Sequence, residues 1–145
     1  MKTIKNIQGF VIYTSEIEHD NTKSLLAEAV KNEANLRLAD LSGADLRWEN
    51  LRWENLSGAD LSDANLRGAD LRWVIGNLKE IKYFQLERYD VVFTSDILAI
   101  SCQQHPIEKW KKFTDKEISE MDKDALSWWT KWKDFIFQAI ELSKG

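Results

Sequence analysis

A five-residue period runs through the middle of the chain and restricts its fold more than any other feature. Residues 34–73 divide without remainder into eight units: ANLRL, ADLSG, ADLRW, ENLRW, ENLSG, ADLSD, ANLRG and ADLRW. The third position is always leucine, at Leu36, Leu41, Leu46, Leu51, Leu56, Leu61, Leu66 and Leu71. A period of five matches neither the roughly 3.6 residues of a helical turn nor the roughly 2 of a strand. Neither ordinary structure would gather these leucines on one side.

This array resembles the pentapeptide-repeat family, whose pattern is A(D/N)LXX. The resemblance implies a mainly β fold with α-helical additions: a short right-handed quadrilateral β-helix of about two coils, with four units per coil. Each leucine would then point inward and stack on the leucine twenty residues later, as Leu41 on Leu61. The Asn or Asp before each leucine suits a tight corner, since such side chains hydrogen-bond to nearby backbone.

The same stacking places Arg52 beside Arg72 and Trp53 beside Trp73 on one outer face. One interpretation is structural, because guanidinium groups and indoles pack on one another and shield the coil. The other is functional, because exposed Trp together with Arg is the composition of interface hot spots. The sequence leaves both interpretations open.

Glu49 and Glu54 replace the alanine that begins the other six units. A buried carboxylate is costly unless it is paired. We therefore expect either that these side chains turn outward or that a neighbouring arginine such as Arg52 neutralises them.

The flanks have the composition of caps, which a short solenoid needs to cover its open backbone edges. In residues 1–33, two β-rich stretches flank Gln8–Gly9, and residues 22–33 place Leu25, Leu26, Ala29 and Val30 on one helical side. This hairpin and helix, followed directly by the array, resemble the leader of pentapeptide-repeat proteins of phages and prophages.

Residues 74–145 indicate a C-terminal α+β module. Residues 80–86, 90–94 and 97–102 read as short strands, and His105–Pro106 opens a helix. A capping box at residues 114–117 starts a second helix, and a long helix is expected over about 125–142. The aromatic-rich end of this module also resembles the segment that follows such arrays in phage proteins.

The expected long helix carries more apolar side chains than one stripe can hold, among them Trp128, Trp129 and Trp132. One interpretation is that packing against the sheet and the shorter helices accounts for these side chains. The other is that the surplus forms a self-association surface, most simply a homodimer through the C-terminal module.

The chain offers little material for catalysis. Its histidines are His19 and His105, and Cys102 is its one cysteine. Cys102 and His105 have a metal-like spacing, but no second cluster completes a site, and a buried structural cysteine fits better. Phosphate-binding loops and nucleophile elbows are absent. We therefore expect no enzyme, no metal site and no cofactor.

The cellular location follows from the same composition. A single cysteine suits a reducing compartment, and neither a secretory signal nor an apolar run of about 18 residues occurs. We expect a cytoplasmic protein, in the bacterial host if the chain is phage-encoded, without membrane contact.

Three functions fit these features. The first is a non-catalytic interaction or scaffold protein of phage or prophage origin that binds a host or viral macromolecule, in anti-defence or host takeover. The second is a DNA mimic acting on a type II topoisomerase, which the balance of seven carboxylates and five arginines in residues 34–73 disfavours. The third is sequestration of a nucleotide by Trp stacking and Arg–phosphate contacts. Direct binding of nucleic acid is not expected, given the net charge of −4.

Overall fold

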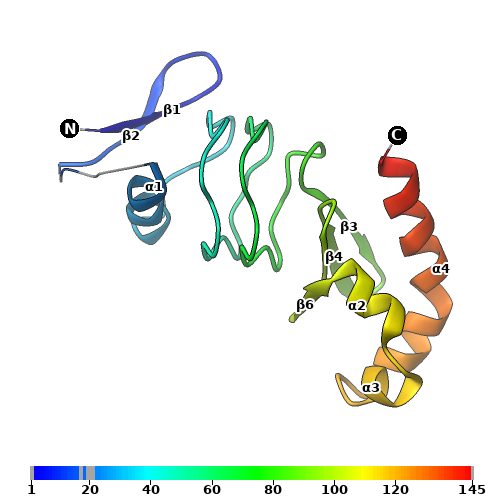
Figure 1. Ribbon diagram of the computed structural model, residues 1–145. Coiled ribbons are helices and arrows are strands. Elements are labelled where there is room, and N and C mark those ends of the chain that lie inside the picture. The colour runs from blue at the N-terminus through cyan, green and yellow to red at the C-terminus, as the bar shows by residue number, and fades with distance from the viewer. Residues whose placement is uncertain (1, 17, 19–21, 145) are drawn as a thin grey trace.

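The computed structural model describes residues 2–16, 18 and 22–144 of the chain. The molecule is elongated, and the repeat array lies between an N-terminal hairpin and helix and a C-terminal sheet with its helices (Figure 1). Parallel backbone bridges join residues twenty positions apart, namely Asp40 with Asp60, Asp45 with Asn65, Asn50 with Asp70, and Asn55 with Ile75. The chain thus returns to the same face after every four units. We call residues 34–53 the first layer and residues 54–73 the second layer.

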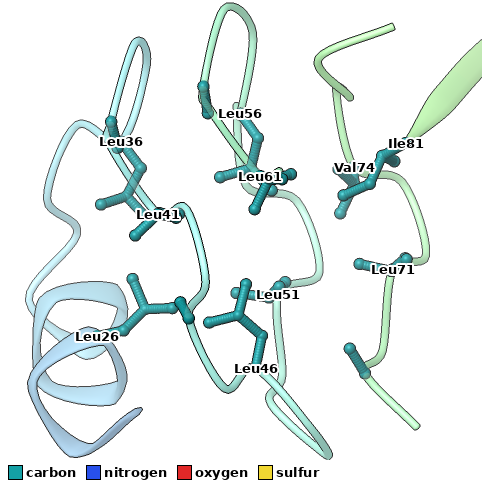
Figure 2. Close-up of a cluster of buried hydrophobic side chains, with 14 of the residues drawn as sticks. Leu26, Leu36, Leu41, Leu46, Leu51, Leu56, Leu61, Leu71, Val74 and Ile81 are labelled. Carbon is teal, nitrogen blue, oxygen red and sulfur yellow. The ribbon is translucent and has the colours of Figure 1, made fainter. Parts of the chain in front are cut away.

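The third-position leucines point into the interior of both layers (Figure 2). Leu36, Leu41, Leu46, Leu51, Leu56, Leu61 and Leu71 are each at most 2% exposed. Leu66 differs, because it is only partly buried.

Every corner of the array uses the same local geometry. In all eight units, Oδ1 of the second-position Asn or Asp accepts a hydrogen bond from the backbone N–H two residues later, at 2.9–3.3 Å. The fifth residue then has a φ of 59–73°, in the left-handed region. Three tryptophans adopt this conformation, which is uncommon for bulky side chains. The corner role predicted for Asn and Asp is confirmed.

The N-terminal hairpin covers the open backbone edge of the first layer. Its strands are β1 (Thr3–Lys5) and β2 (Val11–Thr14), which pair antiparallel. The carbonyl oxygen of Lys5 accepts the N–H of Asp40 at 2.7 Å, and the N–H of Ile7 donates to the carbonyl of Leu38 at 2.8 Å. The hairpin therefore continues the ladder of the array.

Helix α1 (Thr22–Lys31) closes the apolar interior at the same end. Leu25, Leu26 and Ala29 are buried against the first layer, and Val30 is partly buried. Figure 2 shows Leu26 facing the leucines of the array. The apolar side predicted for this helix is thus the side that it buries.

The C-terminal part contains an antiparallel sheet in the order β3-β4-β5-β6. Its strands are β3 (Lys82–Leu86), β4 (Tyr89–Phe93), β5 (Ile97–Ile100) and β6 (Gln103–Pro106). The first three strands were expected, whereas β6 was not. Its sequence, QQHP, lacks β-branched residues, and pairing with β5 gives it a strand conformation.

Three helices follow this sheet: α2 (Ile107–Lys112), α3 (Asp115–Ser119) and α4 (Ala125–Ser143). The predicted capping box is present, since Thr114 and Glu117 each accept the other's backbone N–H, at 3.2 and 3.1 Å. Residues of β4 and β5 and of these helices form a second apolar core, separate from that of the array. Among the described helices, none has an apolar stretch of the length needed to cross a bilayer.

Candidate functional site

Trp53 and Trp73 form a stacked pair on the outside of the array. Their ring centroids lie 4.5 Å apart and the ring planes differ by 7°. Both side chains leave the backbone from a fifth position with positive φ, so the two layers project them in parallel. Trp53 is 67% exposed, whereas Trp73 is half-buried. The indole of Trp53 therefore presents one flat face to solvent, while its other face stacks on Trp73.

Asp70 organises the arginines that flank this pair. Its carboxylate accepts a hydrogen bond from Nη2 of Arg72 at 2.7 Å and lies 3.5 Å from Nε of Arg52. Burial alone would raise the pKa of Asp70, but hydrogen bonds from Arg72 and the charges of both arginines outweigh it and lower that pKa. Arg72 also lies over the ring of Trp73, 5.8 Å from its centroid. We call Arg52, Trp53, Arg72 and Trp73 the ladder face.

The ladder face is joined to the C-terminal sheet. Nη1 of Arg72 donates to the carbonyl oxygen of Cys102, between β5 and β6, at 3.0 Å. Two neighbouring hydrogen bonds reach the array from Gln104, which accepts from the N–H of Leu71 and donates to the carbonyl of Ala69. The ladder face therefore has a fixed orientation relative to β6.

Trp48 is a further exposed aromatic residue that the sequence reasoning did not single out. It is 74% exposed, the most of the tryptophans on the array. Its indole lies over Gly68, where an added Cβ would come within 2.3 Å of the ring. The sequence contained a signal for this exposure. The residue twenty positions after Trp53 is Trp73, which stacks on it, whereas the residue twenty positions after Trp48 is Gly68, which has no side chain.

Glu49 is paired by a residue that was not considered. Its side chain is 15% exposed and forms an ion pair of 2.8 Å with Nζ of Lys23, on α1. Lys23 also donates to the backbone carbonyl of Arg47. The expectation that Glu49 turns outward or pairs with Arg52 is therefore wrong, because the docked helix supplies the cation and Arg52 faces Asp70.

Glu54 is half-buried, and no hydrogen bond or ion pair joins its side chain to the described residues. Burial raises the pKa of its carboxyl group. Glu54 occupies the first position of its unit, and the register of twenty residues places it between Ala34 of the first layer and Val74, which follows the second layer. Neither of the expected solutions, exposure or pairing with Arg52, applies to it in full.

The tryptophans of α4 do not form the exposed surface proposed from the sequence. Trp128 and Trp129 are each 5% exposed and lie in the second core. Nε1 of Trp128 donates to the carbonyl of Leu86 at 2.8 Å, and Trp129 packs on Trp110. Trp132 is partly buried. Packing on the sheet and on α2 accounts for these side chains, so Trp128 and Trp129 are corrected from interaction residues to core residues.

The residues that drew attention as possible metal ligands lie apart from any cluster. Cys102 is exposed, contrary to expectation, and Nε2 of His105 lies 2.9 Å from Oε1 of Gln103. Burial, followed by the charge of Lys109, lowers the pKa of His105. Residues 2–16, 18 and 22–144 contain no group of His, Cys, Asp and Glu suited to a metal ion. His19 lies outside the described residues.

Comparison with known families identifies the array. Residues 24–53 and 50–75 match the family model of pentapeptide repeats, in eight copies. The match covers the array and most of α1 before it, and it confirms the repeat predicted from the sequence. Neither the curated proteins nor the solved structures gave a match. The likeness of the two flanks to phage proteins stays a prediction.

Proposed function

We propose that this protein is a non-catalytic interaction protein that binds a protein partner through the ladder face. Pentapeptide-repeat proteins are often non-catalytic interaction proteins. The observation that carries the proposal is the exposed indole of Trp53, fixed by stacking on Trp73 and flanked by Arg52 and Arg72. Trp and Arg are enriched among the residues that dominate interface energetics. A rigid aromatic side chain such as Trp also loses little conformational entropy on binding.

The proposal includes the finer features implied by the family resemblance. These are a right-handed quadrilateral β-helix of about two coils, a phage or prophage origin, and a cytoplasmic host or viral target in anti-defence or host takeover. A rigid array supports such a role, because it presents one fixed surface without a cost of ordering on binding.

The charge arrangement of the array argues against DNA mimicry. A duplex carries regularly spaced and uncompensated negative charge. Here Asp45 accepts two hydrogen bonds from the guanidinium of Arg47, and Asp70 faces both Arg52 and Arg72. Neighbouring arginines thus neutralise carboxylates that a mimic would need to leave exposed.

Nucleotide sequestration is also less well supported than protein binding. A base cannot enter between Trp53 and Trp73, because the two rings already lie in contact at 4.5 Å. The guanidinium groups of Arg52 and Arg72, which would hold phosphate, already face Asp70. A flat protein surface needs no space between the two rings, because it can pack on the outer face of Trp53 beside Arg52 and Arg72.

We further propose that the protein forms a homodimer through α4. Phe135 and Leu142 are 49% and 75% exposed, and Ala139 between them is partly exposed. These positions follow the i, i+4, i+7 spacing of one helical stripe, which suits helix–helix packing. Light scattering tests this proposal: a dimer that becomes a 16.9 kDa monomer on Leu142→Glu would support it, and a monomeric unaltered protein would contradict it.

A pull-down from a bacterial lysate with matched variants tests the proposed function. The bait would be the full chain, the double variant R52S/W53S, and the control Lys112→Ser on the exposed part of α2. We expect a stoichiometric partner with the unaltered chain and the control, and its loss with R52S/W53S. Absence of any such partner, or equal capture by all three baits, would contradict the proposal.

A further inference from the structure

The second layer exposes an unpaired stretch of backbone at Ala64, Leu66 and Gly68. In the first layer, the equivalent groups are all paired: Asn65 donates to the carbonyl of Ala44 and accepts from the N–H of Leu46, both at 2.9 Å. In the second layer, the carbonyl of Ala64 and the N–H groups of Leu66 and Gly68 have no partner among the described residues. This is an open strand edge, the kind of edge that proteins normally cover.

Side chains cap part of the same edge on the two neighbouring faces. The amide of Gln104 satisfies the N–H of Leu71 and the carbonyl of Ala69, and Nδ2 of Asn77 donates to the carbonyl of Ala59 at 3.1 Å. The carbonyls of Ala59 and Ala69 on the flanking faces are therefore capped, while the carbonyl of Ala64 is not. The N–H groups of Leu61, Asp63 and Trp73 also have no partner among the described residues. Residues 64–68 are the face of the second layer on which no backbone group of the edge is capped.

A groove of about 1000 Å³ lies along this stretch. The groove is lined by Trp48, by residues 64–68 of the array, by residues 94–97 at the β4–β5 connection, and by residues 104–106 of β6. Its volume is at the upper end of the roughly 300–1,000 Å³ of ligand pockets. Leu66, the one partly buried leucine of the third positions, is among the residues that line the groove.

Arg67 differs from the other four arginines of the array, because each of their guanidinium groups has a partner within the array. Arg47 and Arg72 bind the Asp of their own units, Arg52 faces Asp70 in the unit stacked on it, and Arg37 donates to Ser57. The guanidinium of Arg67 has no partner within the described part of the chain, because its own unit has Asn65 and no unit stacks on it. Lys79 and Lys82 also line the groove, together with the carboxylates of Glu80 and Asp96.

We propose that this groove binds an extended acidic segment of a partner protein, which adds a strand parallel to residues 64–68. The carbonyl of Ala64 would accept its N–H, and the N–H groups of Leu66 and Gly68 would donate to its carbonyls, as residues 65 and 67 do for the first layer. An aliphatic side chain of the segment would cover Leu66. The residue before it would be Asp or Glu, paired with Arg67 as Asp70 is paired with Arg52.

The test uses a probe peptide with the chain's own unit sequence, acetyl-GADLSD-amide, which corresponds to residues 58–63. The ¹⁵N-labelled full chain would be titrated to millimolar peptide and followed by NMR. We expect the amide signals of Leu66 and Gly68 to shift and their hydrogen exchange to slow. The amides of Leu46 and Trp48, which are already paired, should stay unchanged and serve as internal controls.

Altered peptides and variants separate backbone pairing from charge. A peptide N-methylated at the Asp before Leu has no N–H to donate to the carbonyl of Ala64. This peptide should bind at least about tenfold more weakly. Arg67→Gln should weaken GADLSD binding about two- to fivefold, as expected of a partly exposed ion pair, and leave GANLSD binding unchanged. Arg37→Gln, on another face, should alter neither.

Three outcomes would overturn the inference: unchanged Leu66 and Gly68 signals at millimolar peptide, equal binding of the N-methylated peptide, or self-association of the chain through this edge. None of these measurements involves Arg52, Trp53, Arg72 or Trp73. Failure of the ladder face to bind a partner would therefore leave this inference standing, and the reverse also holds.

Discussion

The side-chain amide of Gln104 accepts a hydrogen bond from the backbone N–H of Leu71 at 2.8 Å. The same amide donates to the carbonyl of Ala69 at 2.7 Å, so one glutamine replaces the backbone partner that a further unit would supply. We predict that Gln104→Met lowers the free energy of unfolding by about 1–3 kcal/mol, because it leaves both backbone groups unpaired. Urea denaturation measures this loss, and Gln85→Met on exposed β3 is the control. Equal stability of the two variants would contradict the capping role.

Gly43 and Gly68 provide a matched pair for the corner geometry. Both have positive φ, at 68° and 73°, but an added Cβ meets nothing within 4 Å at Gly43 and meets the Trp48 ring at Gly68. We predict that each alanine variant loses about 1 kcal/mol from backbone strain. Only Gly68→Ala should also displace the exposed indole, which ¹⁹F NMR of 5-fluorotryptophan-labelled protein would show as a shift of the Trp48 signal. An unmoved signal would mean that Trp48 does not rest on Gly68.

The sequence was sufficient for the features that depend on the repeat itself. Burial of the leucines, the Asn and Asp corners and the stacking of Trp53 on Trp73 all follow from a constant register of twenty residues. Such features repeat the same local geometry in each unit, so one rule predicts all of them. The difference between Trp53 and Trp48 follows from that register too, once Trp73 and Gly68 are compared.

The remaining features depend on how separate elements dock. Lys23 pairs with Glu49 across 26 positions of sequence, and this contact exists only because α1 packs on the first layer. Strand β6 is polar and was missed, since its pairing with β5 and the contacts of Gln104 determine its conformation. The burial of Trp128 and Trp129 likewise required knowledge of the sheet and of α2 on which they pack.

The stacked pair on the ladder face allows its structural and functional roles to be separated. Trp53 is largely exposed, so its contribution to stability should come chiefly from the contact with Trp73. We predict a coupling energy of about 0.5–1.5 kcal/mol in a double-mutant cycle of Trp53→Ala and Trp73→Ala, measured by urea denaturation. Trp48→Ala with Trp73→Ala should show no coupling. A coupling near zero for Trp53 and Trp73 would leave binding as the only role of the exposed indole.

Glu54 should make stability depend on pH in the direction opposite to that of most carboxylates. Its pKa is raised in the folded state by burial, so the folded protein binds more protons than the unfolded chain between the unfolded and folded pKa values. Stability therefore falls as pH rises through this window and stays lower at neutral pH. We predict that Glu54→Gln raises the free energy of unfolding at pH 7, by less than about 1 kcal/mol after solvent screening.

The pH profile distinguishes this cause from a general effect of removing charge. The advantage of Glu54→Gln should disappear below about pH 4, where the carboxyl is protonated in both states. Glu120→Gln, at an exposed position after α3, should show no such dependence. Because Glu49 has the cation of Lys23 nearby, Glu49→Gln should instead lower stability at pH 7. A gain at Glu54 that persisted unchanged at pH 3 would show that burial of its charge is not the cause.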